Sequence, residues 1–237
     1  MMEVKDIPSK KKGKRYVPTK THEYLPQLNF AMCVVGPRGC GKSLLVKNLL
    51  QRKDMLKETF AKPNYIIIMC PSLHNGDYDD IKGKNIYKYD FYDENIVNHL
   101  MDVQKNIIEE HGRLKCPELL IVLDDILDTG AARMHSKLEK VFARGRHVNI
   151  NIILISQQLK RISKVMRLNS DYMVLFEPNA FVELEDYLNQ YISRKERPTF
   201  MEKLKSMWEE NKHQFLMLDF KTTDKNKRYR KGFTEIL

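Results

Sequence analysis

Hydrophobic residues along this chain gather into short continuous runs, separated by stretches in which apolar and polar residues alternate at helical spacing. Continuous apolar runs are typical of parallel strands that are covered on both faces. The runs predict strands over residues 28–35, 65–69, 119–123, 148–155 and 172–176, a weaker strand over 86–89 and a final one over 215–220. Apolar residues three and four apart predict helices over 42–60, 95–111, 131–143, 181–191 and 199–209. This order predicts an α/β fold with a mainly parallel central sheet and helices on both faces.

A glycine-rich turn stands between the first predicted strand and the first predicted helix. Residues 36–43 read GPRGCGKS and fit the phosphate-loop pattern of glycine, four residues and Gly-Lys-Ser. Glycines let the backbone bend so that successive N–H groups point at phosphate oxygens, and the following helix adds the positive end of its dipole. We therefore predict ATP and Mg²⁺ as cofactors, with Lys42 reaching the β- and γ-phosphates and Ser43 as a metal ligand. The predicted nucleotide contacts are Gly36, Pro37, Arg38, Gly39, Cys40, Gly41, Lys42, Ser43 and Leu44.

Two later strands end in polar residues. The run Leu119–Leu123 is followed by Asp124 and Asp125. Two acids at the end of a buried strand are costly unless the site needs them, and ligands of nucleotide-binding sheets collect at that end. We predict Asp124 as a metal ligand and Asp125 as the general base that polarises water, although either could instead cap a helix. Gln157, after the strand 148–155, is predicted to hold the water or sense the γ-phosphate, unless its amide only satisfies loop backbone.

The composition suits one intracellular domain. The chain has 237 residues, 42% of them hydrophobic, and four cysteines without a C-x-x-C pair. Cys40 lies inside the phosphate loop, where a disulfide would distort the turn, so we expect reduced thiols. We find no secretory signal and no apolar run long enough to span a membrane. We expect a flexible basic arm over 1–20, the ATPase domain over 21–220 and a basic tail over 221–237.

Positive charge is concentrated in three segments. The formal net charge is +10, while residues 1–20 carry +5, residues 144–167 carry +6 and residues 221–237 carry +4. This concentration suggests a polyanionic partner. The run KKKGKR at 10–15 fits a nuclear address, a nucleic-acid contact or a solvated tail equally well. Arg144 and Arg146 could pair with surface acids, or in a ring of subunits they could stabilise charge on a neighbour's γ-phosphoryl group.

These features together resemble a known family. The residues GPRGCGKS (36–43), LLIVLDD (119–125) and ARGRHVNINIILISQQ (143–158) are similar to those of FtsK–HerA translocases, in particular the poxvirus-type genome-packaging ATPases of large eukaryotic DNA viruses and virophages. The resemblance covers about residues 28–178. One departure is Asp125, since many members of the superfamily have Glu there.

The resemblance implies a specific fold, assembly and activity. The fold would be the additional-strand, RecA-like arrangement of the P-loop NTPases, and the assembly a pentameric or hexameric ring. The activity would be ATP-driven movement of double-stranded DNA into a preformed capsid, with a capsid or vertex protein as partner. The protein would act in the host cytoplasm or viral factory, or with the virion. The predicted DNA contacts, to backbone phosphates only, are Lys160, Arg161, Lys164 and Arg167.

Two other functional classes use the same loop. A nucleoside or nucleotide kinase would transfer phosphate to an acceptor, but we find no arginine-rich lid, and paired acids suit water activation. A non-motor NTP-binding switch would bind nucleotide with negligible turnover even when DNA is present.

Overall fold

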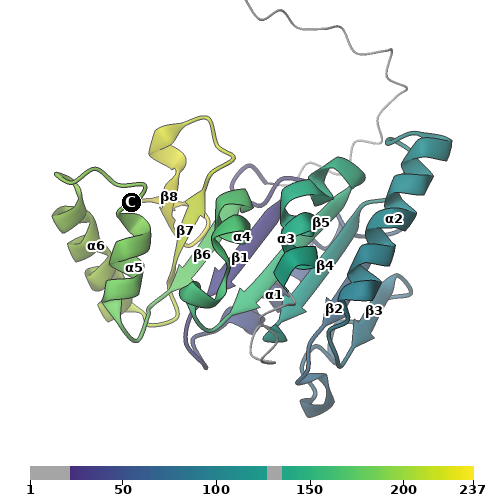
Figure 1. The fold of residues 1–237 in the computed structure, drawn as a ribbon. Helices are drawn as coiled ribbons and strands as arrows, with labels where there is room; N and C mark the ends of the chain where they lie inside the picture. Colours follow the sequence, from purple (N-terminus) through teal and green to yellow (C-terminus); the bar gives the residue numbers. More distant parts are fainter. Residues whose placement is uncertain (1–21, 127–134) are drawn as a thin grey trace, which may run out of the picture.

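The computed structural model describes residues 22–126 and 135–237, and these form a nine-stranded sheet with helices on both sides (Figure 1). From edge to edge, the strands are β3 (Ile86–Tyr89), β2 (Tyr65–Met69), β4 (Leu119–Asp124), β5 (Ile150–Ser156), β1 (Ala31–Val35), β6 (Tyr172–Phe176), β7 (Phe215–Asp219), β8 (Tyr229–Lys231) and β9 (Glu235–Ile236). The main helices are α1 (Lys42–Gln51), α2 (Glu94–His111), α3 (His135–Arg144), α4 (Lys164–Asn169), α5 (Phe181–Leu188) and α6 (Arg197–Glu210).

Six strands are parallel, and their order decides the fold. β4 pairs with β2 on one side and with β5 on the other, and β5 pairs in turn with β1. One additional strand therefore separates the strand before the phosphate loop from the strand that ends in acids. β7, β8 and β9 continue the sheet in antiparallel pairing beyond β6. The predicted additional-strand arrangement is confirmed.

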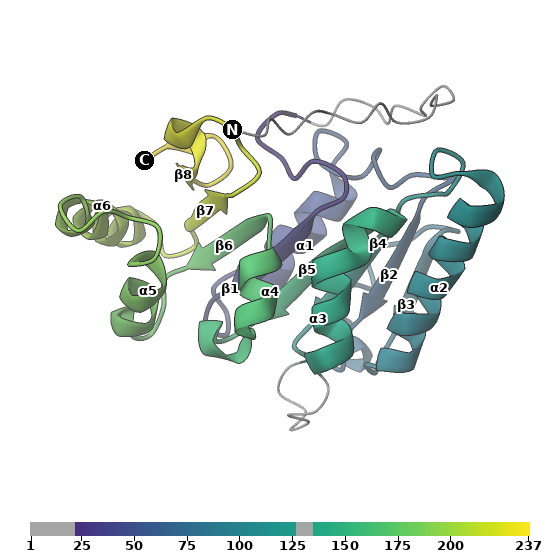
Figure 2. The same ribbon diagram turned by 45° about the horizontal axis from the view of Figure 1, so that its top comes forward.

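Each face of the sheet has its own hydrophobic core. α1 packs on one face, where the buried residues include Val46 and Leu49. α2, α3 and α4 cover the other face, and α5 and α6 extend that layer toward β7 (Figure 2). The central strands are buried along their whole length, as β4 and β5 show. Burial on both faces explains why these strands appear in the sequence as continuous apolar runs. The predicted helices on both faces are confirmed.

The first helix is shorter than predicted. α1 ends at Gln51, and Arg52 takes an extended conformation with φ −84° and ψ 134°. Residues 53–60 form turns that still bury Leu56 and Phe60 on the α1 face, and Leu56 donates its backbone N–H to the carbonyl of Leu49. Apolar spacing therefore predicted the burial of this stretch correctly but not its helical conformation. Likewise, α5 ends at Leu188 rather than at 191.

The segment 221–237 is folded, although a basic tail was predicted there. It contains a short 3₁₀ helix, η5 (Lys225–Lys227), and the strands β8 and β9. The guanidinium of Arg230 is buried and lies 3.1 Å from the Asp219 carboxylate, and its Nη1 and Nη2 also donate to the carbonyls of Lys227 and Tyr24. Lys231 pairs with Glu210 at 2.9 Å. The expected domain boundary at 220 therefore falls inside the sheet, and much of this positive charge is used within the molecule.

Other predictions fall partly outside the described residues. The arm over 1–20 lies outside them, as do residues 131–134 at the start of the predicted helix 131–143. In the described part of the chain, no helix combines the length and hydrophobicity needed to cross a bilayer.

Candidate nucleotide-binding site

The phosphate loop connects β1 to α1 at the carboxyl edge of the parallel strands. Gly41 begins the helix in a left-handed conformation, with φ 110°, and Gly39 has φ 80°. Gly36 is required for a different reason: a Cβ atom there would lie 2.6 Å from Cβ of Phe176 and 2.7 Å from Sγ of Cys40. Glycine suits all three positions: it accepts the positive φ of Gly39 and Gly41, and at position 36 it has no side chain to collide with its neighbours. The glycines predicted from the pattern therefore have distinct structural roles.

Lys42 folds back onto the loop that precedes it. Its side chain is largely buried, and its ammonium group donates a hydrogen bond to the carbonyl of Pro37 at 2.8 Å. A buried cation needs such a partner, and a phosphate oxygen could replace the carbonyl in a complex. Lys42 therefore lies against the phosphate loop, and its contact with the β- and γ-phosphates stays a prediction. Arg38 and Leu44, which were predicted as further contacts, lie exposed beside it.

Ser43 directly contacts β4, the acid strand, which ends at Asp124 and is followed by Asp125. The hydroxyl of Ser43 donates to Oδ2 of Asp124 at 2.9 Å, across 81 residues of sequence. The hydroxyl of Tyr78 donates to the same oxygen at 2.6 Å. Burial raises the pKa of the Asp124 carboxyl, and the two donated hydrogen bonds oppose that rise. Burial and the Asp124 charge raise the pKa of Tyr78 well above its ordinary value, so the phenol keeps its proton and acts as the donor.

The donor set at this point suits Mg²⁺. No group of three or more His, Cys, Asp or Glu side chains able to hold a metal occurs within residues 22–126 and 135–237. Mg²⁺ in nucleotide sites needs fewer protein ligands, because phosphate oxygens and water complete its shell. A serine hydroxyl beside a buried carboxylate supplies the oxygen donors that such a metal takes. Ser43 and Asp124 therefore fit their predicted role as metal ligands.

Asp125 faces the adjacent strand rather than Ser43. The amide nitrogen of Gln157, after β5, lies 3.0 Å from Oδ1 and 2.8 Å from Oδ2 of Asp125. Asp125 adopts a left-handed backbone, with φ 58°, which non-glycine residues seldom occupy. The two residues predicted from separate strand ends are thus in contact, and the amide holds the carboxylate from one side.

Arg144 and Arg146 lie at the end of the sheet where the parallel strands begin, opposite the phosphate loop. Arg144 ends α3, and Arg146 lies in the short 3₁₀ helix η3 (Gly145–Val148) just before β5 begins, whereas the phosphate loop follows the last residue of β1. β1 and β5 run parallel, so a strand length of roughly 17–23 Å separates the two arginines from the loop of the same subunit. Both side chains are exposed. Neither side chain can reach the phosphate loop of its own subunit.

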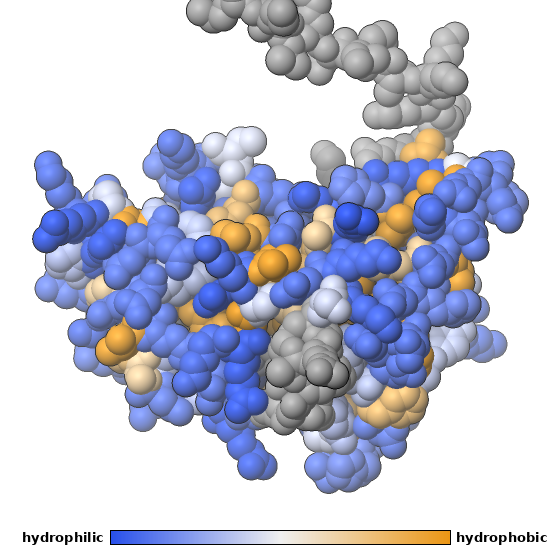
Figure 3. All heavy atoms as spheres, in the orientation of Figure 1, coloured by the Kyte–Doolittle hydropathy of each residue, from blue (hydrophilic) through white to orange (hydrophobic). Residues whose placement is uncertain are grey.

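The four predicted DNA contacts lie in and before α4. Lys160, Arg161 and Lys164 are exposed and Arg167 is half-buried. Figure 3 shows that the face carrying α3 and α4 is mostly hydrophilic, with scattered hydrophobic residues. On α4 itself, Val165 is 41% and Leu168 61% exposed. The segment 144–167 lacks acids, but the fold brings in Glu183, whose carboxylate accepts the backbone N–H of Lys160.

Two residues near the loop were not predicted from the sequence. Tyr78 lies in the polar stretch between β2 and β3, where no pattern marked it. His213, in the turn before β7, contacts the carbonyl of Cys40 through Nδ1 at 3.1 Å. Both reach the site through long-range packing, so local sequence gave no signal for either.

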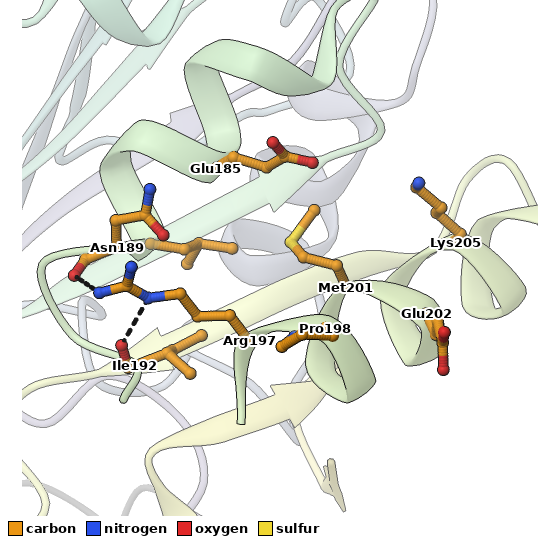
Figure 4. A pocket seen from close by; sticks show the side chains of 9 residues that line it. Glu185, Asn189, Ile192, Arg197, Pro198, Met201, Glu202 and Lys205 are labelled. Atoms are coloured by element: carbon orange, nitrogen blue, oxygen red, sulfur yellow. Dashed lines mark hydrogen bonds between the residues drawn. The ribbon is translucent and has the colours of Figure 1, made fainter. Parts of the chain in front are cut away.

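A surface cavity of about 400 Å³ lies elsewhere, between α5 and α6. In Figure 4 the guanidinium of Arg197 points to the backbone oxygens of Asn189 and Ile192, to which it donates at 2.8 Å and 3.0 Å. Leu188 and Met201 supply apolar walls. None of the predicted nucleotide or metal contacts lines this cavity, so it is separate from the phosphate loop.

Comparisons with known proteins find relatives encoded by DNA viruses. Among curated relatives, an uncharacterised protein 015R of Frog virus 3 (isolate Goorha) is 27% identical over 174 residues, covering 72% of this chain and 52% of the relative. The DNA packaging protein OPG160 of vaccinia virus (strain Copenhagen) is 23% identical over 160 residues, covering 66% of this chain and 56% of the relative. The chain thus spans about half the length of these relatives.

A solved structure shares the fold. The DNA-packaging ATPase B204 of Sulfolobus turreted icosahedral virus superposes with a TM-score of 0.61 at 17% identity, covering 89% of this chain and 99% of that protein. The family described as Poxvirus A32 protein matches residues 20–229 of this chain. Because that match includes the phosphate loop, the acid strand and most of the sheet, this chain belongs to the Poxvirus A32 protein family.

Proposed function

We propose that this protein is an ATP-hydrolysing motor that moves double-stranded DNA, and that it packages a viral genome into a preformed capsid. The observation that carries this proposal is the contact between the phosphate loop and the acid strand, where Ser43 meets Asp124 at 2.9 Å. Relatives named as DNA packaging proteins support the choice of DNA as the substrate that is moved.

The chain's own residues divide the work at the γ-phosphate. Lys42 exchanges the Pro37 carbonyl for phosphate oxygens and so neutralises charge where ATP binds. Asp125 orients and polarises the attacking water, and the Gln157 amide fixes the carboxylate in place. Mg²⁺, held by Ser43 and Asp124, would neutralise the phosphates and orient them for in-line attack.

Arg144 and Arg146 act in this proposal on the nucleotide of a neighbouring subunit. Both are exposed and lie at the edge opposite the loop, so a head-to-tail ring is the arrangement in which they can meet a γ-phosphoryl group. An arginine supplied in this way accelerates other nucleotide hydrolases by roughly 10³–10⁵-fold. The ring, pentameric or hexameric, would therefore be needed for rapid turnover.

The basic residues around α4 would contact the DNA backbone. Lys160 and Lys164 are exposed ammonium groups on one short segment. Contacts to phosphates carry no sequence information, which suits a motor that must pass any sequence. The logarithm of the DNA affinity should fall linearly with the logarithm of the salt concentration, and the slope should reflect the number of phosphates contacted.

One experiment separates this proposal from the alternatives. ATP turnover is measured with and without duplex DNA, the products are separated, and the assembled mass is determined. DNA-stimulated release of free phosphate by a ring supports the motor. A phosphorylated nucleoside acceptor would indicate a kinase, and nucleotide binding with negligible turnover in the presence of DNA would indicate a switch.

Two variants assign the chemistry within that assay. Lys42→Ala should abolish productive phosphate binding, because Lys42 is the cation that folds back over the loop onto the Pro37 carbonyl, whereas Arg38 is exposed. Asp125→Asn should bind nucleotide normally but hydrolyse it slowly, because an amide cannot accept the proton of water. Undiminished turnover in Asp125→Asn would remove Asp125 from the general-base role.

A further inference from the structure

Tyr78 is a buried aromatic residue that reaches the candidate metal ligands from outside both sequence motifs. It lies in the connection between β2 and β3, residues 70–85, and its side chain is fully buried. Its hydroxyl and the Ser43 hydroxyl both donate to Oδ2 of Asp124, at 2.6 Å and 2.9 Å. The carboxylate therefore has two fixed donors, one from the phosphate-loop helix and one from this connection.

The backbone at Tyr78 is unusual. Its φ of 65° is left-handed. The other described non-glycine residues with positive φ are Asn29, Asp125 and Asn149, so Tyr78 is the aromatic residue among them. Asn and Asp tolerate this region, whereas a bulky residue there is a genuine outlier. Lys88 holds the conformation by donating to the Tyr78 carbonyl at 2.6 Å. Strain of this kind persists where the surroundings impose it, and it clusters at functional sites.

The same connection is attached to α1. Ser43, Lys47 and Gln51 are spaced four apart and form one stripe along that helix. Lys47 lies 3.4 Å from the Asp80 carboxylate and 5.6 Å from the centre of the Tyr78 ring, and Gln51 donates to Asp80 at 2.8 Å. The helix that carries Ser43 thus holds the segment that carries Tyr78 through Lys47 and Gln51, at the two turns that follow Ser43.

We propose that Tyr78 is a positioning residue for the nucleotide-bound metal: its hydroxyl fixes the Asp124 carboxylate, and through it the Ser43 hydroxyl, in the orientation that binds Mg²⁺. This inference rests on the proposed nucleotide-binding function and adds to it a residue that belongs to neither motif. Groups that orient metal ligands in this way are worth about 10–100-fold in metal affinity in other proteins. A phenol that only filled space would contribute packing but no metal dependence.

The test compares two tyrosine variants of the full chain. Tyr78→Phe removes the hydroxyl and keeps the ring. Tyr172→Phe is the matched control, because Tyr172 is also buried and its hydroxyl also makes a hydrogen bond, accepting from the backbone N–H of Gln27 at 3.1 Å at the opposite edge of the sheet. Affinity for a fluorescent, non-hydrolysable ATP analogue is measured with Mg²⁺ and in EDTA, and the ratio of the two affinities is the readout.

Tyr78→Phe should lower that ratio by about 10-fold or more, while its affinity in EDTA stays at the wild-type value. Tyr172→Phe should keep the wild-type ratio even if its melting temperature falls. An unchanged ratio in a folded Tyr78→Phe protein overturns the inference alone. A wild-type protein that binds the analogue no better with Mg²⁺ than in EDTA overturns the proposed function as well.

A second measurement does not depend on the stability of the variant. Fluorotyrosine incorporated at position 78 keeps the hydroxyl and the volume, and its ¹⁹F resonance is followed as Mg²⁺ is added to the analogue complex. The resonance at position 78 should shift, and a probe at position 172 should not. A ¹⁹F resonance at position 78 whose chemical shift does not change when Mg²⁺ is added overturns the proposal.

Discussion

Replacing Gln157 tests whether its amide positions Asp125, the proposed general base. In Gln157→Met the side chain keeps its length but loses both N–H donors, so the Asp125 carboxylate loses the contacts at 2.8 Å and 3.0 Å. A hydrogen bond to a charged group contributes about 1.5–3 kcal/mol. Gln157 is only half-buried, so water can replace part of the contact and the lower figure applies. Because 1.36 kcal/mol is a factor of ten in rate, kcat should fall by about tenfold.

The assay is phosphate release at saturating ATP and duplex DNA, with nucleotide affinity measured separately. Affinity should stay at the wild-type value, because Gln157 contacts Asp125 and not the phosphate loop. Gln158→Met is the matched control: it removes the neighbouring amide, whose Oε1 accepts from Arg161 rather than touching Asp125. An undiminished kcat in Gln157→Met, or an equal loss in both variants, would refute the positioning role.

Three further predictions concern other parts of the molecule. Arg230→Met should lower the free energy of unfolding by about 3 kcal/mol and the melting temperature by about 6–12 °C, because it leaves the buried Asp219 carboxylate without its cation; an unaltered melting curve would show that the C-terminal strands do not stabilise the domain. Arg144→Ala or Arg146→Ala subunits, mixed into wild-type protein, should depress turnover more than in proportion to their share while binding nucleotide normally; proportional loss would argue against action across an interface. Burial raises the pKa of the Cys40 thiol, so at pH 7 it is protonated; its alkylation, followed by mass spectrometry, should be slow at pH 7, accelerate with rising pH and be blocked by nucleotide, and fast alkylation at pH 7 would contradict this.

Local patterns were sufficient to locate the phosphate loop and the acidic strand end that we propose as the phosphate and metal contacts. The phosphate loop needs glycines at fixed spacing within eight residues, so the requirement is visible in the sequence. The acid strand is similar, because a continuous apolar run that ends in Asp124 has few structural explanations. β1 and β4 are buried on both faces, which made the two strands easy to recognise, although β1 begins at Ala31 rather than at residue 28.

The spatial order of the strands and the contacts it creates required the tertiary structure. Helical spacing predicted that Leu56 and Phe60 lie in a helix, but these side chains are buried equally well by a segment of turns. The basic composition of 221–237 suggested a tail, because the charge of Arg230 gives no sign of the Asp219 carboxylate that neutralises it. Neither error involves the phosphate loop or the acid strand.

The sequence by itself determined the phosphate loop, the two acids, the alternation of strands and helices, and a family resemblance that the comparison confirmed. Only the tertiary structure decided that β5 lies between β1 and β4, that Gln157 therefore reaches Asp125, and that Tyr78 completes the contacts of Asp124. The physical reason is range. Backbone geometry and burial constrain residues that are close in the sequence and so produce periodic patterns in it. The hydrogen bond between Tyr78 and Asp124, 46 positions apart, depends instead on how the whole chain packs.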